Sequence, residues 1–380
     1  MTIDRISEIE TRTAVVPLPK PVAWSNVRVS AREFLFVWIR TESGAEGMGF
    51  TVGSRFPGGA RVIQAVVDHV LKPVLAGRDP DEIERLWEDM YFRGLLLGTR
   101  GALMRALSAV DIALWDLLAK RCGRRLCDML GRYRESVPAY ASGGYYYEDD
   151  ADRDLALLEE EVRRHLDLGF TDIKMKVGRR AWREELRRVE RVLEVAGPGV
   201  RVAVDANHAW RDVASAITDL RTIDDLGLWW IEEPFLPDQV DAAARLADKL
   251  TTPLATGEIE AGRWAFRAIQ EAGAAAIFQA DATVAGGISE WLKIAGMAAA
   301  SDIPIAPHWV PYVHVHLGAS TASVMSLEYF HETTGVLGFD ALLARPLELA
   351  KGEIVVPPGD GHGIELDMDA IDHYEERVGL

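Results

Sequence analysis

The first fifty residues alternate between apolar and polar side chains. This alternation runs from Ile3 to about Val52 and is interrupted by a turn signal at Glu42-Ser43-Gly44, which predicts an antiparallel β-meander. Three helical patterns follow, over Ala60 to Leu75, Asp81 to Tyr91 and Ala102 to Ala119. Strands followed by helices indicate an α+β domain.

Beyond about Val137, short apolar runs alternate with helical segments, which is typical of parallel βα units. The predicted strands are Val137 to Ala141, Thr171 to Lys176, Arg201 to Asp205, Trp229 to Glu232, Pro253 to Gly257, Ala275 to Gln279, Ile303 to Pro307 and Val324 to Glu328. Eight strands favour a closed barrel. The alternative is an open doubly wound sheet, but Ser142-Gly143-Gly144 after the first strand is not the glycine-rich loop that binds dinucleotides.

The length of the chain agrees with two domains. Its 380 residues provide for a barrel of about 200 to 250 residues and a second domain. We assign residues 1–130 to the α+β domain and 131–344 to the barrel. The tail from about 345 to 380 contains a Pro357-Pro358-Gly359 turn, and we expect it to pack back on the N-terminal domain.

Composition narrows the choice of partners and compartment. Acidic residues outnumber basic ones 59 to 42, a net charge of −17, so nucleic acids and anionic membranes are not expected partners. An anionic substrate would need a local island of positive charge. Two cysteines, Cys122 and Cys127, form no disulfide framework, and the charged N-terminus has no signal-peptide character. We therefore expect a cytoplasmic protein.

Ionisable side chains stand where seven of the predicted barrel strands end. They are Lys174 with Lys176, Asp205, Glu232, Glu258, Asp281, His308 and Glu328. From Asp205 onward the intervals are 20 to 27 residues, about one βα unit each. Because catalytic residues of barrels lie at the C-terminal ends of strands, this pattern predicts an active site.

Asp205, Glu232 and Glu258 end three consecutive strands. Three oxygen ligands without sulfur or imidazole suit a hard divalent cation such as Mg²⁺. The alternative is that each carboxylate caps a following helix or pairs with an arginine.

Lys174 and Lys176 are two residues apart on one strand, so both should point into the barrel mouth. Mutual repulsion near a metal should depress their pKa, so that one lysine acts as a base while the other holds the substrate carboxylate. The alternative is a solvated strand face.

Asp281 and His308 end neighbouring strands, where a carboxylate would orient the imidazole as a second acid/base. The alternative is a structural histidine, and His314 and His316 compete for the role. Glu328, if protonated, could donate a hydrogen bond to the oxygen that gains charge; otherwise it caps a helix.

Taken in order, these motifs resemble the enolase superfamily and, within it, the mandelate racemase subgroup. The resemblance rests on Lys174-x-Lys176, Asp205-x-Asn207, Ile231-Glu232-Glu233-Pro234, Gly257-Glu258, Asp281 with Gly286-Gly287, Pro307-His308, Ser326-Leu327-Glu328 and the helix Ala109-Val110-Asp111-Ile112-Ala113-Leu114-Trp115-Asp116. It implies an α/β fold, a (β/α)₇β modified TIM barrel with an N-terminal α+β capping domain completed by the C-terminal tail. It also implies one Mg²⁺ on Asp205, Glu232 and Glu258, and a homo-oligomer.

The same resemblance implies acid/base work by Lys176 and the His308–Asp281 pair, with Lys174 on the substrate carboxylate and Glu328 on its enolic oxygen. Residues 132–140, 205–208 and the tail are similar to acid-sugar dehydratases and lactone cycloisomerases of this subgroup. We expect removal of the proton alpha to the carboxylate of a sugar acid and dehydration to a 2-keto-3-deoxy acid. Cycloisomerisation of a sugar-acid lactone, racemisation or epimerisation of a 2-hydroxy acid, and a catalytically silent metabolite-binding barrel are the alternatives.

Substrate specificity is expected from two loops of the N-terminal domain, about Pro19 to Val29 and Gly49 to Gly59. They carry Trp24 and Arg55, and Arg55 could bind a distal carboxylate. Asn207 and His208 are further candidates for substrate binding, and the tyrosines Tyr145, Tyr146 and Tyr147 are candidates for lining the pocket. The alternative is that the loops are simply exposed.

Overall fold

The N-terminal part is built on a three-stranded sheet. The computed structural model of the chain describes residues 3–53 and 57–375. Its first strands are β1 (Ile6–Trp24), β2 (Val27–Thr41) and β3 (Glu46–Val52). They pair antiparallel in the order β1-β2-β3, which confirms the predicted meander.

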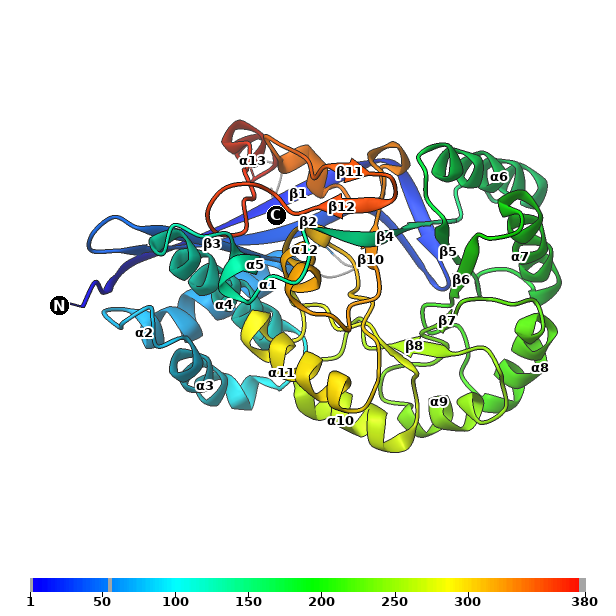
Figure 1. The fold of residues 1–380 in the computed structure, drawn as a ribbon, viewed down its shortest axis with the longest axis horizontal. Coiled ribbons are helices and arrows are strands. Elements are labelled where there is room, and N and C mark those ends of the chain that lie inside the picture. The colour runs from blue at the N-terminus through cyan, green and yellow to red at the C-terminus, as the bar shows by residue number, and fades with distance from the viewer. Residues whose placement is uncertain (1–2, 54–56, 376–380) are drawn as a thin grey trace.

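Helices pack beside this sheet (Figure 1). They are α1 (Gly59–Val66), the π-helix η1 (Val67–Leu71), α2 (Lys72–Leu75), α3 (Ile83–Gly94), the 3₁₀ turn η2 (Leu95–Leu97), α4 (Ala102–Arg121) and α5 (Leu126–Met129). The helix expected from Ala60 to Leu75 is thus three consecutive helical segments. Most residues of α4 are buried.

Two glycines of β3 let the sheet approach α4 closely. A Cβ atom on Gly49 would stand 2.0 Å from the carbonyl oxygen of Ala109, and one on Gly47 would stand 2.2 Å from that of Ala113. No real Cβ tolerates such distances, so the packing of β3 on α4 requires glycine at both positions.

The second part is a barrel of parallel strands. They are β4 (Ser136–Gly143), β5 (Asp172–Lys176), β6 (Arg201–Asp205), β7 (Ile231–Glu232), β8 (Leu254–Thr256), β9 (Ile277–Phe278) and β10 (Leu327–Tyr329). Neighbours from β4 to β9 pair in chain order, and β10 pairs with β4. The sheet therefore closes on itself, as a (β/α)₇β barrel with an N-terminal α+β domain.

The expected strand from Ile303 to Pro307 is reduced to one bridged residue. Ile305 forms isolated parallel bridges to Phe278 and to Val324. Pro304 and Pro307 stand on either side of it, and proline cannot donate a ladder hydrogen bond. The barrel is continuous at Ile305, but the prediction of a regular strand from Ile303 to Pro307 is wrong.

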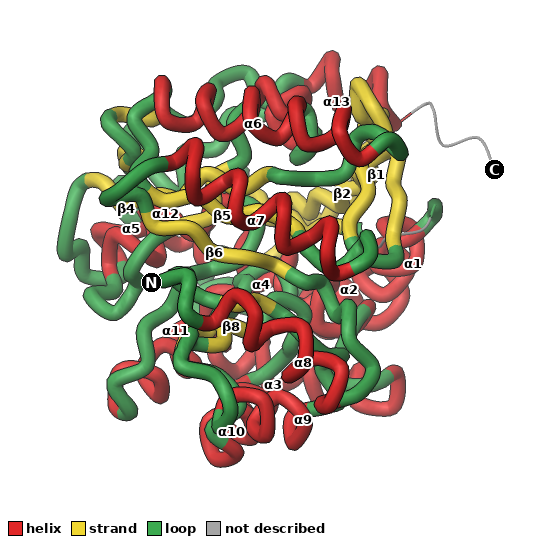
Figure 2. Tube along the Cα trace, turned by 90° about the vertical axis from the view of Figure 1, so that its right-hand side faces the viewer, coloured by secondary structure: helices red, strands yellow, loops and turns green. Residues whose placement is uncertain are grey.

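Helices surround the barrel on its outer face (Figure 2). They are α6 (Ala151–Asp167), α7 (Trp182–Ala196), α8 (Val213–Asp224), α9 (Val240–Ala247), α10 (Arg263–Ala272), α11 (Gly287–Ala300) and α12 (Pro311–Ser320). Within residues 3–53 and 57–375, none of the helices has both the length and the apolar character that crossing a bilayer requires.

The two parts share a hydrophobic core and a polar contact. One buried cluster joins Phe36 and Phe50 of the N-terminal sheet to Ile288 and Trp309 of the barrel. Asp111 of α4 accepts hydrogen bonds from the backbone N–H of Ser289, at 2.9 Å, and from its hydroxyl, at 2.6 Å. This carboxylate therefore caps the start of α11 and docks the N-terminal part on the barrel.

The C-terminal tail contacts both parts. After the 3₁₀ turns η3 (Glu332–Thr334) and η4 (Phe339–Leu342) come β11 (Leu349–Ala350), β12 (Glu353–Val355) and α13 (Met368–Glu375). β12 pairs antiparallel with β4, whereas α13 lies near β1 (Figure 1) and is held there by Arg12, which bonds Asp372 and Glu375. The boundaries at residues 130 and 344 stay predictions.

We predict that Gly49→Ala lowers stability by about 1–3 kcal/mol, because the added methyl group would overlap the backbone of α4. Gly296→Ala in α11 is the matched control, since a Cβ there meets open space; it should raise stability by up to about 1 kcal/mol. Urea unfolding of both variants measures the difference. A Gly49→Ala protein as stable as the wild type would contradict the close approach.

Candidate active site

One pocket lies between the barrel and the N-terminal part. The barrel lines it with Tyr145, Lys176, Asn207, Glu258, Ile259, Asp281, Val284, His308 and Trp309. The N-terminal part lines it with Trp24, Arg32, Glu33, Val52, Gly53 and Arg105. Four ionisable residues expected at strand ends, Lys176, Glu258, Asp281 and His308, therefore meet around one cavity.

Asp205, Glu232 and Glu258 lie together, and Glu258 of this group lines the pocket. Each offers one carboxylate oxygen, and these oxygens all lie within 4.8 Å of one another. The parallel register of β6 and β7 sets Asp205 beside Glu232. Burial, together with the charge of Asp205, raises the pKa of Glu232 well above its ordinary range. Three buried acids this close form a set of hard oxygen donors for a divalent cation.

The two lysines of β5 are held by these carboxylates. Lys174 Nζ lies 2.5 Å from Glu232 and 2.7 Å from Glu328, and Lys176 Nζ bonds Asp205. Burial alone would lower the pKa of each lysine, but the neighbouring carboxylates outweigh it, so the pKa of both lies above its ordinary value. The carboxylates in ion-pair contact with each ammonium group account for this direction. The depression expected beside a bound metal stays a prediction.

His308 and Asp281 form a hydrogen-bonded pair. His308 Nδ1 lies 3.1 Å from Asp281 Oδ2, and His308 Nε2 lies 3.5 Å from Glu258 Oε2. Burial would lower the pKa of His308, but Glu258 and the hydrogen bond to Asp281 raise it to about 9. Asp281 is itself oriented by the backbone N–H and the hydroxyl of Thr283. The imidazole is thus fixed, with one nitrogen on its orienting carboxylate.

The competing histidines are structural. His314 Nε2 accepts a hydrogen bond from the backbone N–H of Ala282 at 2.9 Å. His316 lies between the backbone N–H of Cys127 and the carbonyl oxygen of His362. Both rings are buried in α12 and neither lines the pocket.

Glu328 is an acceptor in this structure. Its Oε1 accepts from the hydroxyl of Ser142 at 2.7 Å and lies 2.7 Å from Lys174 Nζ, while its Oε2 accepts from the backbone N–H of Trp309 at 2.6 Å. Burial opposes ionisation, but Lys174 lowers the pKa of Glu328 below its ordinary range. The contacts of Glu328 are those of an acceptor, and its protonated, hydrogen-bond-donating form stays a prediction.

Asn207 and His208 are adjacent in the turn after β6, but their side chains have different surroundings. Asn207 lines the pocket, and its backbone N–H donates to Asp205 at 2.9 Å. His208 does not line the pocket, and its Nε2 lies 3.2 Å from Glu233. Glu233 in turn accepts from the backbone N–H of Gly257 at 2.8 Å. We therefore assign His208 the role of orienting Glu233 instead of the expected role of binding substrate.

The loops of the N-terminal part contribute unevenly to the pocket. Trp24 and residues 52–53 line it, whereas Arg55 lies outside the described residues. Arg32, which the sequence did not single out, has its guanidinium carbon 4.5 Å from the ring centre of Trp309 and 5.2 Å from that of Trp24. Arg32 had no local signal, because only the docking of the two parts brings it to the pocket.

Of the three tyrosines expected near the pocket, Tyr145 lines it, whereas Tyr146 and Tyr147 do not. Two barrel residues were missed. Trp309 lines the pocket next to a predicted position and adopts a left-handed φ of 70°. Glu233 also has a positive φ, 44°. Such backbone conformations in bulky residues cost energy and tend to occur at functional sites. Trp309 could have been found from its position directly after His308. Glu233 could have been found because it follows a second glutamate, Glu232, and precedes Pro234.

The chain is similar to known proteins along nearly its whole length. Residues 8–131 match the family Mandelate racemase / muconate lactonizing enzyme, N-terminal domain, and residues 157–370 match the family Enolase C-terminal domain-like. Arabinonate dehydratase of Saccharolobus solfataricus is 32% identical over 348 residues, 90% of this chain and 91% of that protein. D-galactarolactone cycloisomerase of Agrobacterium fabrum is 33% identical over 382 residues, 97% of this chain and 98% of that protein.

Solved structures give the same picture. A racemase from Streptomyces coelicolor with bound magnesium superposes with a TM-score of 0.89 at 32% identity, covering 97% of this chain and 99% of that chain. L-talarate/galactarate dehydratase from Salmonella typhimurium, liganded with Mg and L-lyxarohydroxamate, superposes with a TM-score of 0.88 at 32% identity. That match covers 98% of this chain and 93% of the other.

We predict that Asp281→Asn lowers the pKa of His308, because it removes a charge that favours the imidazolium. NMR titration of the imidazole signals in chelator-treated protein measures the pKa, and we expect a value of about 9 for His308 in the wild type. Asp248→Asn, at an exposed ion pair with Lys249, is the control.

The raised pKa of His308 also determines how this residue changes the free energy of unfolding with pH. The folded pKa of His308 exceeds the unfolded value of about 6.5, so its contribution is present below pH 6.5 and is lost as pH rises through about 9. Asp281→Asn should flatten this part of the pH–stability curve. An unchanged pKa in the variant would refute the pairing.

Proposed function

This chain belongs to the mandelate racemase subgroup of the enolase superfamily, and on that premise we propose that it dehydrates a sugar acid to a 2-keto-3-deoxy acid. It is an enzyme of a group whose similar members are named as sugar acid dehydratases and lactone cycloisomerases. One observation carries the proposal. Lys176 and His308 line the same pocket as Glu258, one of the three carboxylates that could hold a metal ion, and His308 is paired with Asp281.

The donor set fits one Mg²⁺. Asp205, Glu232 and Glu258 are buried and supply three convergent carboxylate oxygens, and we assign these three residues to holding the ion. A bound Mg²⁺ supplies positive charge that stabilises the negative charge which a substrate carboxylate gains as its α-proton leaves. Similar proteins of known structure were solved with magnesium.

Lys176 is assigned to removing the α-proton. Its ammonium group bonds Asp205, and a carboxylate engaged as a metal ligand no longer favours that ammonium. The neutral amine then becomes accessible near neutral pH, which a general base requires. Lys174 lies deeper, beside Glu232 and Glu328, and we assign it to the substrate carboxylate, with Glu328 holding it in place.

His308 is assigned to the leaving group. As an imidazolium held by Asp281, it gives its proton to the β-hydroxyl, and the C–O bond breaks as water departs. The carbon–carbon double bond forms from the electrons of the broken C–H bond, and tautomerisation of this enol yields the 2-keto-3-deoxy acid. The α-proton remains on Lys176 until solvent removes it.

The wall that the N-terminal part contributes to the pocket favours a substrate with a polar or anionic terminus. Arg32 and Arg105 are brought there by the N-terminal part, in a chain whose net charge is −17. Guanidinium groups recognise carboxylates in bidentate geometry. A sugar diacid therefore agrees with this wall better than an unsubstituted monoacid.

The experiment that tests the function is a substrate screen of the Mg²⁺-loaded protein in D₂O, followed by NMR. Its panel contains sugar monoacids, sugar diacids and their lactones. We expect a keto acid from one stereochemical series of free acids. Keto acid from a lactone alone would establish the cycloisomerase alternative, and α-deuterium without elimination would establish an epimerase.

Two variants complete the screen. Lys176→Met and His308→Asn should each lower turnover by about 10²–10⁴-fold, the usual contribution of a general acid or base. Glu271→Gln, at an exposed position of α10, is the control. Wild-type protein that neither forms keto acid nor exchanges an α-proton with any compound of the panel would favour the silent barrel.

The metal assignment predicts a loss of binding that does not depend on turnover. Calorimetric titration of chelator-treated protein with Mg²⁺ should give one site per chain. Asp205→Asn and Glu232→Gln should each weaken it by about tenfold or more, because each removes a charged oxygen ligand. Wild-type affinity in both variants would remove these carboxylates from the metal site.

A further inference from the structure

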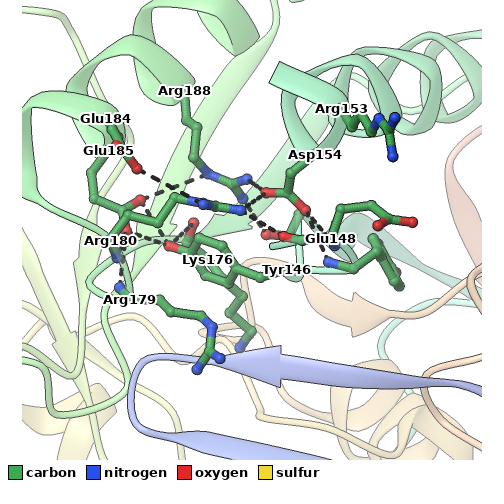
Figure 3. Close-up of polar contacts among 12 residues, drawn as sticks. Tyr146, Glu148, Arg153, Asp154, Lys176, Arg179, Arg180, Glu184, Glu185 and Arg188 are labelled. Carbon is green, nitrogen blue, oxygen red and sulfur yellow. Dashed lines mark hydrogen bonds and ion pairs between the residues drawn. The ribbon is translucent and has the colours of Figure 1, made fainter. Parts of the chain in front are cut away.

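A buried polar cluster lies behind the strand that carries Lys176 (Figure 3). At its centre the carboxylate of Glu185 accepts a hydrogen bond from the hydroxyl of Tyr146 at 2.7 Å. The same carboxylate accepts from the backbone N–H of Arg179 at 2.9 Å and of Arg180 at 2.6 Å. Glu185 and Tyr146 are buried, with 0% and 3% of their surface exposed. None of these four residues lines the active-site pocket.

Glu185 fixes the turn that follows Lys176. It stands in the first turn of α7, where a carboxylate satisfies the free N–H groups that precede a helix. The turn begins directly after β5, so these two hydrogen bonds determine how the chain leaves Lys176. The backbone of Lys176 faces the cluster, while its side chain extends away from it (Figure 3).

Arg188 and Asp154 fix the segment that follows β4. Arg188 bonds Asp154 and donates to the carbonyl oxygen of Gly144 at 2.8 Å. Its guanidinium carbon lies 4.1 Å from the ring centre of Tyr146. Asp154 accepts from the backbone N–H of Tyr147 at 2.9 Å. Tyr146 is therefore held on its ring face, at its hydroxyl and through the backbone of its neighbours.

The same tyrosine connects the barrel to the hairpin that carries Trp24. The backbone of Tyr146 pairs with that of Ala23, with N···O distances of 2.9 and 3.3 Å. The side chain of Arg179 donates to the carbonyl oxygen of Ser25 at 3.1 Å. Ala23 and Ser25 stand on either side of Trp24, so both contacts hold the N-terminal wall of the pocket.

One residue earlier, Tyr145 reaches the reacting side chains. Lys176 Nζ lies 5.1 Å from the ring centre of Tyr145, and the Tyr145 ring meets that of Trp24 edge to face with 5.7 Å between centres. A displacement of Tyr146 would therefore move Tyr145, the contact of Lys176 and the contact of Trp24 together.

We propose that Tyr146 is a positioning residue whose hydrogen bond to Glu185 sets the place of Lys176, and that Arg179 separately ties down the Trp24 hairpin. This inference rests on the proposed function, in which Lys176 is a base. His308, which we place on the opposite face of the substrate, is oriented by Asp281, and Asp281 is held by Thr283, outside this cluster. Loss of the Tyr146 hydroxyl should therefore impair one face of the reaction and spare the other.

The test uses α-proton exchange with D₂O in the Mg²⁺-loaded enzyme, for both α-epimers of its substrate. Lys176→Met and His308→Asn first establish which epimer each base serves. Tyr146→Phe should then lower the exchange rate of the Lys176 epimer by about tenfold or more, since displacements near 1 Å cost up to about 10²-fold. Exchange of the His308 epimer should stay within about threefold, and KM should be nearly unchanged.

A matched control and a second variant separate positioning from folding. Tyr147→Phe removes the hydroxyl of the next residue, which lines a separate surface pocket with Lys20 and Glu160, and should leave both rates unchanged. Arg179→Met keeps the backbone N–H to Glu185 but removes the bond to Ser25; it should raise KM for both epimers by a few fold without preferring one face.

The outcomes are distinguishable. Equal loss for both epimers in Tyr146→Phe, or no loss for the Lys176 epimer, would overturn the positioning role while leaving the proposed function intact. Wild-type enzyme that neither forms keto acid from its substrate nor exchanges the α-proton of either epimer would overturn the proposed function and the positioning role with it. A selective loss in Tyr146→Phe, absent in Tyr147→Phe, supports the inference.

Discussion

The mutual repulsion of three buried carboxylates is the constraint on which the rest of the site depends. Asp205, Glu232 and Glu258 converge to within 4.8 Å where water is excluded, so their negative charges require compensation nearby. In this structure Lys174 and Lys176 supply it. A divalent cation held by the same oxygens would neutralise their charge, so that the lysines would no longer be needed as counter-ions. The neighbours of each group therefore decide whether a lysine is a counter-ion or a base.

A second constraint is that the pocket belongs to two parts of the chain. The barrel supplies the groups at its strand ends, while Trp24, Arg32 and Arg105 come from the N-terminal part. Their docking depends on Asp111 at the start of α11 and on the shared apolar core. The cluster around Glu185 and Tyr146 adds a third junction, next to the end of β5, the strand that carries Lys176. Precision at the site is thus maintained by contacts that lie outside the pocket.

Much of the site could be predicted because barrel geometry converts regular spacing into convergence. Once the strands were located, their last residues had to meet at one end, and Asp205, Glu232 and Glu258 do so, as do Asp281 and His308. The same rule could not foresee that His208, directly after Asn207, serves Glu233 instead of the pocket. Two adjacent residues in a turn point in directions that only the φ angles of that turn decide.

The sequence by itself determined the order of strands and helices, the closure of the barrel and the types of side chain at each strand end, because these follow from local periodicity and chain length. It could not determine that Pro304 and Pro307 reduce one strand to a single bridged residue, that the lysine pKa values lie high, or that Glu328 is an acceptor. Nor could the sequence predict that Arg32 lies against Trp24 and Trp309, or that Tyr146 donates a hydrogen bond to Glu185. Those outcomes depend on distances between residues far apart in the chain, and electrostatic and hydrogen-bond energies change steeply with such distances.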